Sequence, residues 1–188
     1  MIKIGITGSL SSGKTTVSKI LSYKRGPLFN ADKVVKDIYR SKLFKQKVSK
    51  IFKIKNKKQI KNSIKKIIFN NNSNIKKLEK IIHPLVRKKM QFFTIKHKHK
   101  KLLFYEIPLL IENKLMKFFH VIIFVKANKS TRFKRFKSKK GDKKLFHLLN
   151  NRQLKDSKKI NYSDHIVVNE SNLNILKKNL LAIIRKYE

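Results

Sequence analysis

The sequence contains no cysteine and no tryptophan, and only five glycines and three prolines in 188 residues. Without cysteine, disulfides and thiolate metal sites are excluded, and a reducing cytoplasm is compatible. Apolar runs are short, as in VIIFV at 121–125, whereas a bilayer span needs roughly 20 apolar residues. The chain also begins directly on a strand-like pattern. We therefore expect a single cytoplasmic domain with neither a membrane span nor a signal peptide.

Acidic residues are also scarce, because ten of them face 49 lysines and arginines, which gives a formal net charge of +39. Such a surface favours nucleic-acid binding, since it releases counterions from phosphates. However, only seven of the basic residues are arginine, the better side chain for forked phosphate contacts. The lysines are scattered over nearly every polar face beside abundant Asn, Ile and Phe, which AT-rich codons encode. We interpret the charge as drift and expect no specific nucleic acid.

Short apolar runs alternate with helical patterns along the chain. Strands are predicted at 2–7, 27–29, 101–106, 120–127 and 164–169. Helices are predicted at 13–23, 128–138, 143–153 and 172–186. This alternation predicts an α/β protein with a mainly parallel five-stranded sheet flanked by helices.

The stretch from 33 to 100 is helical in pattern and contains no good strand, so we interpret it as an inserted helical subdomain. We predict a single domain divided into a core at 1–31, 101–136 and 154–188, an insertion at about 32–100, and a lid at about 137–153. Within the insertion, the Asn run at 70–74 predicts a loop, and Pro84 predicts a helix start. His83 is then either a boundary histidine held by local hydrogen bonds or a substrate contact.

The most specific motif is GSLSSGKT at residues 8–15, which fits G-x-x-x-x-G-K-[ST] between a strand and a helix. Its backbone N–H groups and the helix N-terminus bind phosphates, Lys14 reaches the β- and γ-phosphates, and Thr15 offers a hydroxyl to Mg2+. Ser9 and Ser11 stand where some kinases of this class carry glycine, and serine fits there if φ is negative. The predicted ATP contacts in this motif are Gly8, Ser11, Ser12, Gly13, Lys14, Thr15 and Thr16.

Three of the few acids stand where chemistry is expected. Asp32 follows a short strand, at the carboxyl edge of the sheet, where it can accept or orient the proton of an attacking hydroxyl. The alternative is a helix N-cap or a first-turn acid, and both can hold together. Glu106 ends a strand and either holds magnesium, directly or through water, or has no role. Glu112 either clamps a basic side chain or caps a helix.

Arg132 and Arg135 end the helix that precedes the polar break at 137–144. An arginine-bearing lid excludes water and stabilises the transferred phosphate in kinases. We predict Arg135 as the catalytic arginine of such a lid, with Arg152 closing from the other side.

Taken together, these motifs resemble the dephospho-coenzyme A kinase family over nearly all of the chain. The matching stretches, in order, are IGITGSLSSGKTT, NADKVVK at 30–36, the HP pair at 83–84, EIPLLIE at 106–112, RFKRF at 132–136, RQ at 152–153 and SDHIVVNES at 163–171. The phosphate motif alone is unspecific, whereas NAD, HP and PLLIE at these spacings are specific.

The resemblance implies ATP-dependent phosphorylation of the ribose 3′-hydroxyl of dephospho-coenzyme A, the last step of coenzyme A biosynthesis. It implies ATP and Mg2+, Asn169 as a nucleotide contact, and Asp32, His83, Glu106 and Glu112 as acceptor contacts, with a monomer favoured. Two departures stand out: Asn30 replaces the first acid of a D-A-D motif, and Glu106 stands for a more usual Asp. Another P-loop small-molecule kinase, or a basic nucleic-acid-binding protein, is the alternative.

Overall fold

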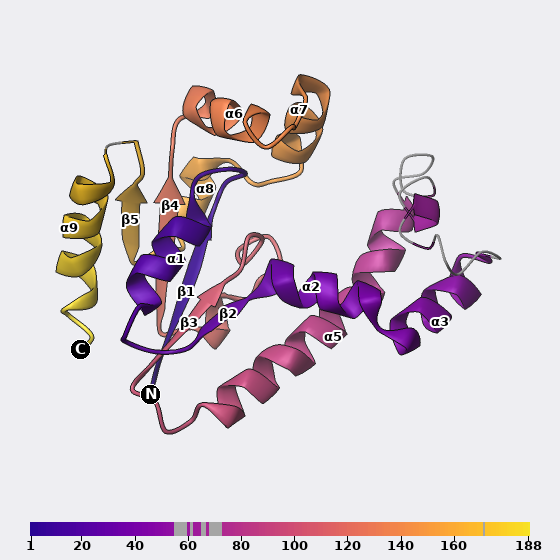
Figure 1. Cartoon of the computed structure of the whole chain (residues 1–188), viewed down its shortest axis with the longest axis horizontal. Helices are drawn as coiled ribbons and strands as arrows, with labels where there is room; N and C mark the ends of the chain where they lie inside the picture. Colours follow the sequence, from indigo (N-terminus) through magenta and orange to yellow (C-terminus); the bar gives the residue numbers. More distant parts are fainter. Residues whose placement is uncertain (55–59, 61, 65–66, 68–72, 171) are drawn as a thin grey trace. The chain divides into compact units, whose positions relative to one another are not determined.

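The computed structural model of the chain describes every residue except 55–59, 61, 65–66, 68–72 and 171. Its strands form a five-stranded sheet in the order β2-β3-β1-β4-β5, and each neighbouring pair is parallel (Figure 1). The strands are β1 (Ile2–Gly8), β2 (Leu28–Asn30), β3 (Leu102–Glu106), β4 (Val121–Lys126) and β5 (His165–Val168). The predicted α/β class and parallel five-stranded sheet are confirmed.

Helices connect these strands, and most of them were predicted. The four expected helices correspond to α1 (Lys14–Ser22), α6 (Lys129–Lys137), α7 (Lys143–Asn151) and α9 (Leu173–Ile184), with ends that agree within two residues. The sequence analysis missed α8 (Asp156–Ile160) and the 3-10 helix η2 (Met116–Phe118), which are too short to show a helical period. Among the described residues, no helix combines the length and apolarity needed to cross a membrane.

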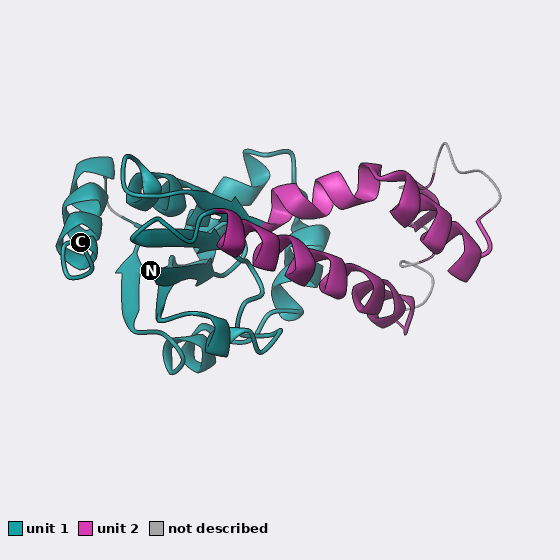
Figure 2. Cartoon of the chain, turned by 90° about the horizontal axis from the view of Figure 1, so that it is seen from below, with its two compact units in different colours: residues 1–30, 97–188 teal, residues 31–96 magenta. Residues whose placement is uncertain are grey.

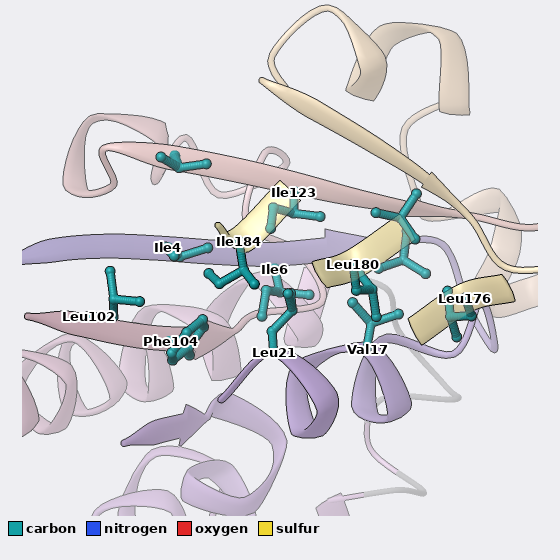
Figure 3. Packing of buried hydrophobic residues seen from close by; sticks show 13 residues of the cluster. Ile4, Ile6, Val17, Leu21, Leu102, Phe104, Ile123, Leu176, Leu180 and Ile184 are labelled. Carbon is teal, nitrogen blue, oxygen red and sulfur yellow. The ribbon is translucent and has the colours of Figure 1, made fainter. Parts of the chain in front are cut away.

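The main core lies between β1, α1 and α9 (Figure 3). Alternate residues of β1 point to the same face of the sheet, and residues four apart share one face of a helix. The sequence meets both conditions, so these side chains converge: Ile4 and Ile6 from β1, Val17 and Leu21 from α1, and Leu176, Leu180 and Ile184 from α9. This packing fixes the start of α1 at the end of β1.

The chain divides into two compact units, residues 1–30 with 97–188 and residues 31–96 (Figure 2). The first unit holds the sheet. The described elements of the second are α2 (Ala31–Arg40), α3 (Lys42–Ile51) and α5 (Ser73–Lys96), which agrees with the helical pattern of this stretch. The segment predicted as a lid, 137–153, belongs to the first unit and contains α7; its role as a lid stays a prediction.

The predicted helix start at Pro84 is wrong, because Pro84 lies inside the continuous helix α5. Proline inside a helix removes one hydrogen bond and costs about 3 kcal/mol. Apolar residues on both sides of Pro84 pack into the core of the second unit, namely Leu78, Ile81, Ile82, Leu85 and Val86. Burial of these side chains, at about 1.5–3 kcal/mol for each one fully buried, outweighs the lost bond.

The same helix corrects the predicted loop at 70–74. Ser73 and Asn74 belong to the first turn of α5, and the Asn74 side chain donates to the Ile67 carbonyl at 3.3 Å. Residues 70–72 lie outside the described residues. His83 is therefore a mid-helix residue and not a boundary histidine.

The C-terminal segment carries a pH-dependent contact, because His165 Nε2 lies 2.6 Å from the Tyr187 hydroxyl. Burial and the nearby Lys186 lower the pKa of His165, against an opposing effect of Asp164. Because the pKa of His165 is lowered, the neutral side chain stabilises the folded protein. This stabilisation is complete above the ordinary histidine pKa of about 6.5 and is lost as the pH falls below it, toward the lowered pKa. Between pH 7.5 and 5.5, we expect the Tm of His165→Gln to fall less than that of the wild type, measured by circular dichroism. Equal pH dependence of the two proteins would contradict this assignment.

Candidate active site

The phosphate loop, residues 8–15, runs from the end of β1 into α1 at the centre of the sheet. Gly13 is the N-cap of α1 and adopts φ 96°, a left-handed conformation that favours glycine. A Cβ there would lie 2.0 Å from Asn169 Nδ2, so a side chain has no space either. The glycine of the Gly-Lys-Thr motif is therefore required for both the turn and the close approach of Asn169.

Ser11 does not have the negative φ that the sequence analysis required for a serine. Its φ is 59°, in the left-handed region. A residue with a Cβ loses about 1–2 kcal/mol in that conformation. Ser11 is thus a strained substitution at a position suited to glycine, and the expectation of a relaxed serine was wrong.

We expect Ser11→Gly to stabilise the protein by about 0.5–1 kcal/mol, because relief of strain exceeds the entropy that glycine adds to the unfolded chain. Ser9→Gly is the matched control in the same loop. Ser9 is 2% exposed and donates to Asp156 Oδ1, so its replacement should destabilise the protein. Urea unfolding of both variants measures the free energy of unfolding, which should rise for Ser11→Gly and fall for Ser9→Gly. A destabilised Ser11→Gly protein would refute the strain at this position.

The Lys14 ammonium lies over the phosphate loop and donates to the carbonyls of Gly8 at 3.1 Å and Ser9 at 2.9 Å. The N-terminus of a helix such as α1 carries a partial positive charge and is a general binding site for phosphate oxygens. Ser12 Oγ is buried and has no hydrogen-bond partner among the described residues. The Ser12 hydroxyl, the start of α1 and the Lys14 ammonium together fit a polyphosphate.

Glu106, which ends β3, reaches the start of α1. Its carboxylate is 2% exposed, and Oε1 accepts a hydrogen bond from the Thr15 hydroxyl at 2.6 Å. Oε2 accepts from Ser18 Oγ at 2.9 Å and from Asn30 Nδ2 at 2.7 Å. Glu106 therefore accepts a hydrogen bond from the predicted metal ligand Thr15. The sequence alone indicated only that both residues lie at the same edge of the sheet.

On the other side of the loop, Arg135 and Asn169 meet at the carbonyl of Ser12. Arg135 Nη1 donates to Ser12 O at 3.2 Å and Nη2 to Asn169 O at 2.9 Å, while Asn169 Nδ2 donates to Ser12 O at 2.8 Å. The structure thus brings together three residues that the sequence analysis named separately. The contact puts the Arg135 guanidinium beside the phosphate loop.

A second group of side chains supports the loop, and of these the sequence pattern indicated Arg132 but not Asp156. Gln153 Oε1 accepts from Leu10 N at 2.8 Å, and Asp156 accepts from Ser9 Oγ. Arg132 is 6% exposed and donates to Leu10 O at 3.4 Å and to Asn150 Oδ1 at 2.7 Å. Burial lowers the pKa of Arg132, although Asp156 opposes this effect. The residue pair RQ at 152–153 was a partial signal for Gln153.

Glu112 forms an ion pair with Lys159, with Nζ 2.7 Å from Oε1, and the Lys159 side chain is fully buried. Oε1 also accepts from Leu154 N at 3.2 Å, whereas Oε2 is buried and has no hydrogen-bond partner among the described residues. Of the two alternatives left open for Glu112, the structure shows the clamp on a basic side chain. Glu112 also lines a cavity of about 630 Å³, together with Arg152, Gln153 and Tyr162.

Two predicted site residues belong to the second unit. Asp32 is exposed in the first turn of α2, which directly follows β2, and His83 lies in the middle of α5. The alternative of a first-turn acid is thus met for Asp32, and it is compatible with a catalytic role. The contacts of both residues with substrate stay predictions.

The fold and the phosphate loop together define the chain as a P-loop kinase. The family model of dephospho-CoA kinase matches residues 2–174. The chain is 34% identical to the dephospho-CoA kinase of Fusobacterium nucleatum over 93% of both chains, and 32% identical to that of Bartonella henselae over 97% of this chain and 96% of the other. A solved dephospho-CoA kinase from Campylobacter jejuni superposes with a TM-score of 0.66 at 25% identity, covering 99% of this chain and 97% of that one. The chain belongs to the dephospho-CoA kinase family.

Proposed function

We propose that this chain transfers the γ-phosphate of ATP to the ribose 3′-hydroxyl of dephospho-CoA, giving CoA and ADP. The observation that carries the proposal is the phosphate loop with Thr15 held by Glu106, in a chain whose family model matches residues 2–174. In the reaction, the new bond joins the 3′-oxygen to the γ-phosphorus. The bond from the γ-phosphorus to the β,γ-bridging oxygen breaks, and ADP leaves.

The phosphate loop binds ATP. Backbone N–H groups at the start of α1 contact phosphate oxygens, and the helix dipole adds a partial positive charge there. Lys14 exchanges its present carbonyl contacts for the β- and γ-phosphates, and Asn169 supports the loop at Ser12. Gly8, Ser11, Ser12, Gly13, Thr15 and Thr16 complete the predicted ATP contacts.

Thr15 and Glu106 are the residues that would hold Mg2+. Oxygen ligands suit this hard cation. The Thr15 hydroxyl donates its hydrogen bond to Glu106, so the lone pairs of the Thr15 oxygen stay available to a metal. When bound, Mg2+ would neutralise negative charge on the phosphates.

Asp32 accepts the proton of the attacking 3′-hydroxyl and orients that group. Arg135 neutralises charge that develops on the transferred phosphoryl group. In the lid segment, Phe146 of α7 packs against Phe133 and Phe136 of α6, with ring centroids 5.2 and 5.6 Å apart. A lid would therefore move as α6 and α7 together, carrying Arg135 with it.

His83 and Glu112 are the proposed contacts of the acceptor, and Glu112 lines a cavity of the first unit. The support for Glu112 is its buried Oε2, which has no hydrogen-bond partner among the described residues and can accept from a substrate hydroxyl or amide.

A coupled assay of ADP release tests the proposal. Dephospho-CoA is compared with a panel of nucleoside monophosphates under identical conditions, and we expect turnover with dephospho-CoA alone. Folded protein that turns over a nucleoside monophosphate instead would favour another P-loop kinase. For the nucleic-acid alternative, DNA binding is titrated with salt, and we expect it to fade steeply because it rests on unspecific lysine contacts.

A further inference from the structure

The two departures from the family pattern, Asn30 and Glu106, lie in contact with each other. They are the last residues of β2 and β3 and stand opposite one another in the parallel register. Neighbouring residues in this register point to the same face of the sheet, so the strands themselves bring the two side chains together. The result is the 2.7 Å hydrogen bond from Asn30 Nδ2 to Glu106 Oε2.

We propose that Asn30 is a positioning residue for phosphoryl transfer, because its amide holds Glu106 in the orientation in which Glu106 fixes the hydroxyl of Thr15. This inference rests on the proposed function and adds a residue to it. Asn30 does not touch the reacting atoms. Its effect passes through the carboxylate to Thr15.

The two carboxylate oxygens of Glu106 accept hydrogen bonds from different donors. Oε1 accepts from Thr15, while Oε2 accepts from Ser18 and Asn30. Thr15 and Ser18 lie on the same helix, so Asn30 is the donor that holds the carboxylate from a different element. Without it, rotation of the carboxylate about its last side-chain bond is restrained from α1 alone.

An amide suits position 30 because its partner is an acid. An ionised carboxylate only accepts hydrogen bonds, and Glu106 already needs donors for both oxygens. An aspartate in place of Asn30 would bring a second carboxylate to hydrogen-bond distance, and such pairs repel unless they share a proton. The loss of an acid at position 30 is thus matched to the longer acid at position 106.

The experiment compares Asn30→Asp with the double variant Asn30→Asp/Glu106→Gln, in which donor and acceptor are exchanged and one carboxylate remains. We expect Asn30→Asp to lower kcat at pH 8 by about 10- to 100-fold, the usual range for residues that orient a ligand of a metal, with little change in KM. The double variant also removes the carboxylate that would help to hold Mg2+, so it is compared with the single variant in stability and not in kcat. Asn174→Asp, an exposed residue of α9, adds the same charge as a control and should leave kcat unchanged.

A second measurement does not depend on activity. In Asn30→Asp, two carboxylates meet at hydrogen-bond distance and repel, so the Tm should fall below that of the wild type. The double variant should recover part of this loss, because a donor again faces the one remaining carboxylate. An active wild type whose Asn30→Asp variant keeps kcat within about twofold, or whose double variant has no higher Tm than the single one, overturns the inference. No turnover of dephospho-CoA by the wild type overturns the proposed function instead.

Discussion

Asp32→Ala is expected to lower kcat by about 100- to 10,000-fold while ATP binding stays at the wild-type level. The reason is that, in the proposed function, Asp32 takes the proton of the acceptor hydroxyl, whereas the phosphate loop binds ATP. Steady-state ADP release gives kcat, and calorimetric titration with a non-hydrolysable ATP analogue gives the binding constant. Lys14→Ala should differ by weakening both quantities, since Lys14 binds the phosphates directly.

Asp37→Ala is the matched control on the same helix. Asp37 is exposed like Asp32, and its ion pair with Arg40 is long, at 3.7 Å, and solvated. Both substitutions remove one negative charge from α2, so a general effect of charge would appear equally in both. Asp32→Ala protein with kcat within about twofold of the wild type would show that Asp32 is not the base.

Glu112→Ala is expected to destabilise the protein by about 3–5 kcal/mol. The substitution leaves the ammonium of Lys159 without its partner at a position that is fully buried. Water cannot reach the charge, so the cost of desolvation is no longer offset by the ion pair. The change in free energy of unfolding is measured by urea denaturation at fixed ionic strength.

The double variant Glu112→Leu/Lys159→Met separates this charge effect from loss of packing. Replacement of both partners by apolar side chains of similar size is often neutral or stabilising, so we expect it to be at least about 2 kcal/mol more stable than Glu112→Ala. Lys158→Met, at an exposed neighbouring position, should change stability little. A Glu112→Ala protein as stable as the wild type would mean that Lys159 finds another partner.

Several elements of this fold could be predicted because their causes are local. The apolar runs at 2–7, 101–106 and 120–127 are buried strands, and a buried strand is hydrophobic along its whole length. The motif at residues 8–15 predicted a phosphate-binding turn, because its glycines permit the backbone conformation of the turn and its lysine contacts the phosphates. Parallel strands end at one edge, which placed Glu106 near the loop before any contact was known.

Two expectations failed because a local rule met a stronger distant interaction. Proline is a helix breaker on average, but Pro84 lies within α5 because the apolar residues around it pack into a shared core. Serine prefers negative φ, but Ser11 is held at 59° between Leu10 and Ser12, whose backbone groups are bound by Gln153 and Asn169. Those partners lie more than 100 residues away along the chain, beyond any window of sequence pattern.

The sequence by itself determined the class of fold, the phosphate loop and the family to which the chain belongs. These follow from short motifs whose chemistry is contained in a few adjacent residues. Only the tertiary structure decided that Glu112 pairs with Lys159, that Arg135 and Asn169 meet at Ser12, and that Asn30 donates to Glu106. The physical reason is that hydrogen bonds and ion pairs act over about 3 Å in space, and the sequence order does not fix which distant residues come that close.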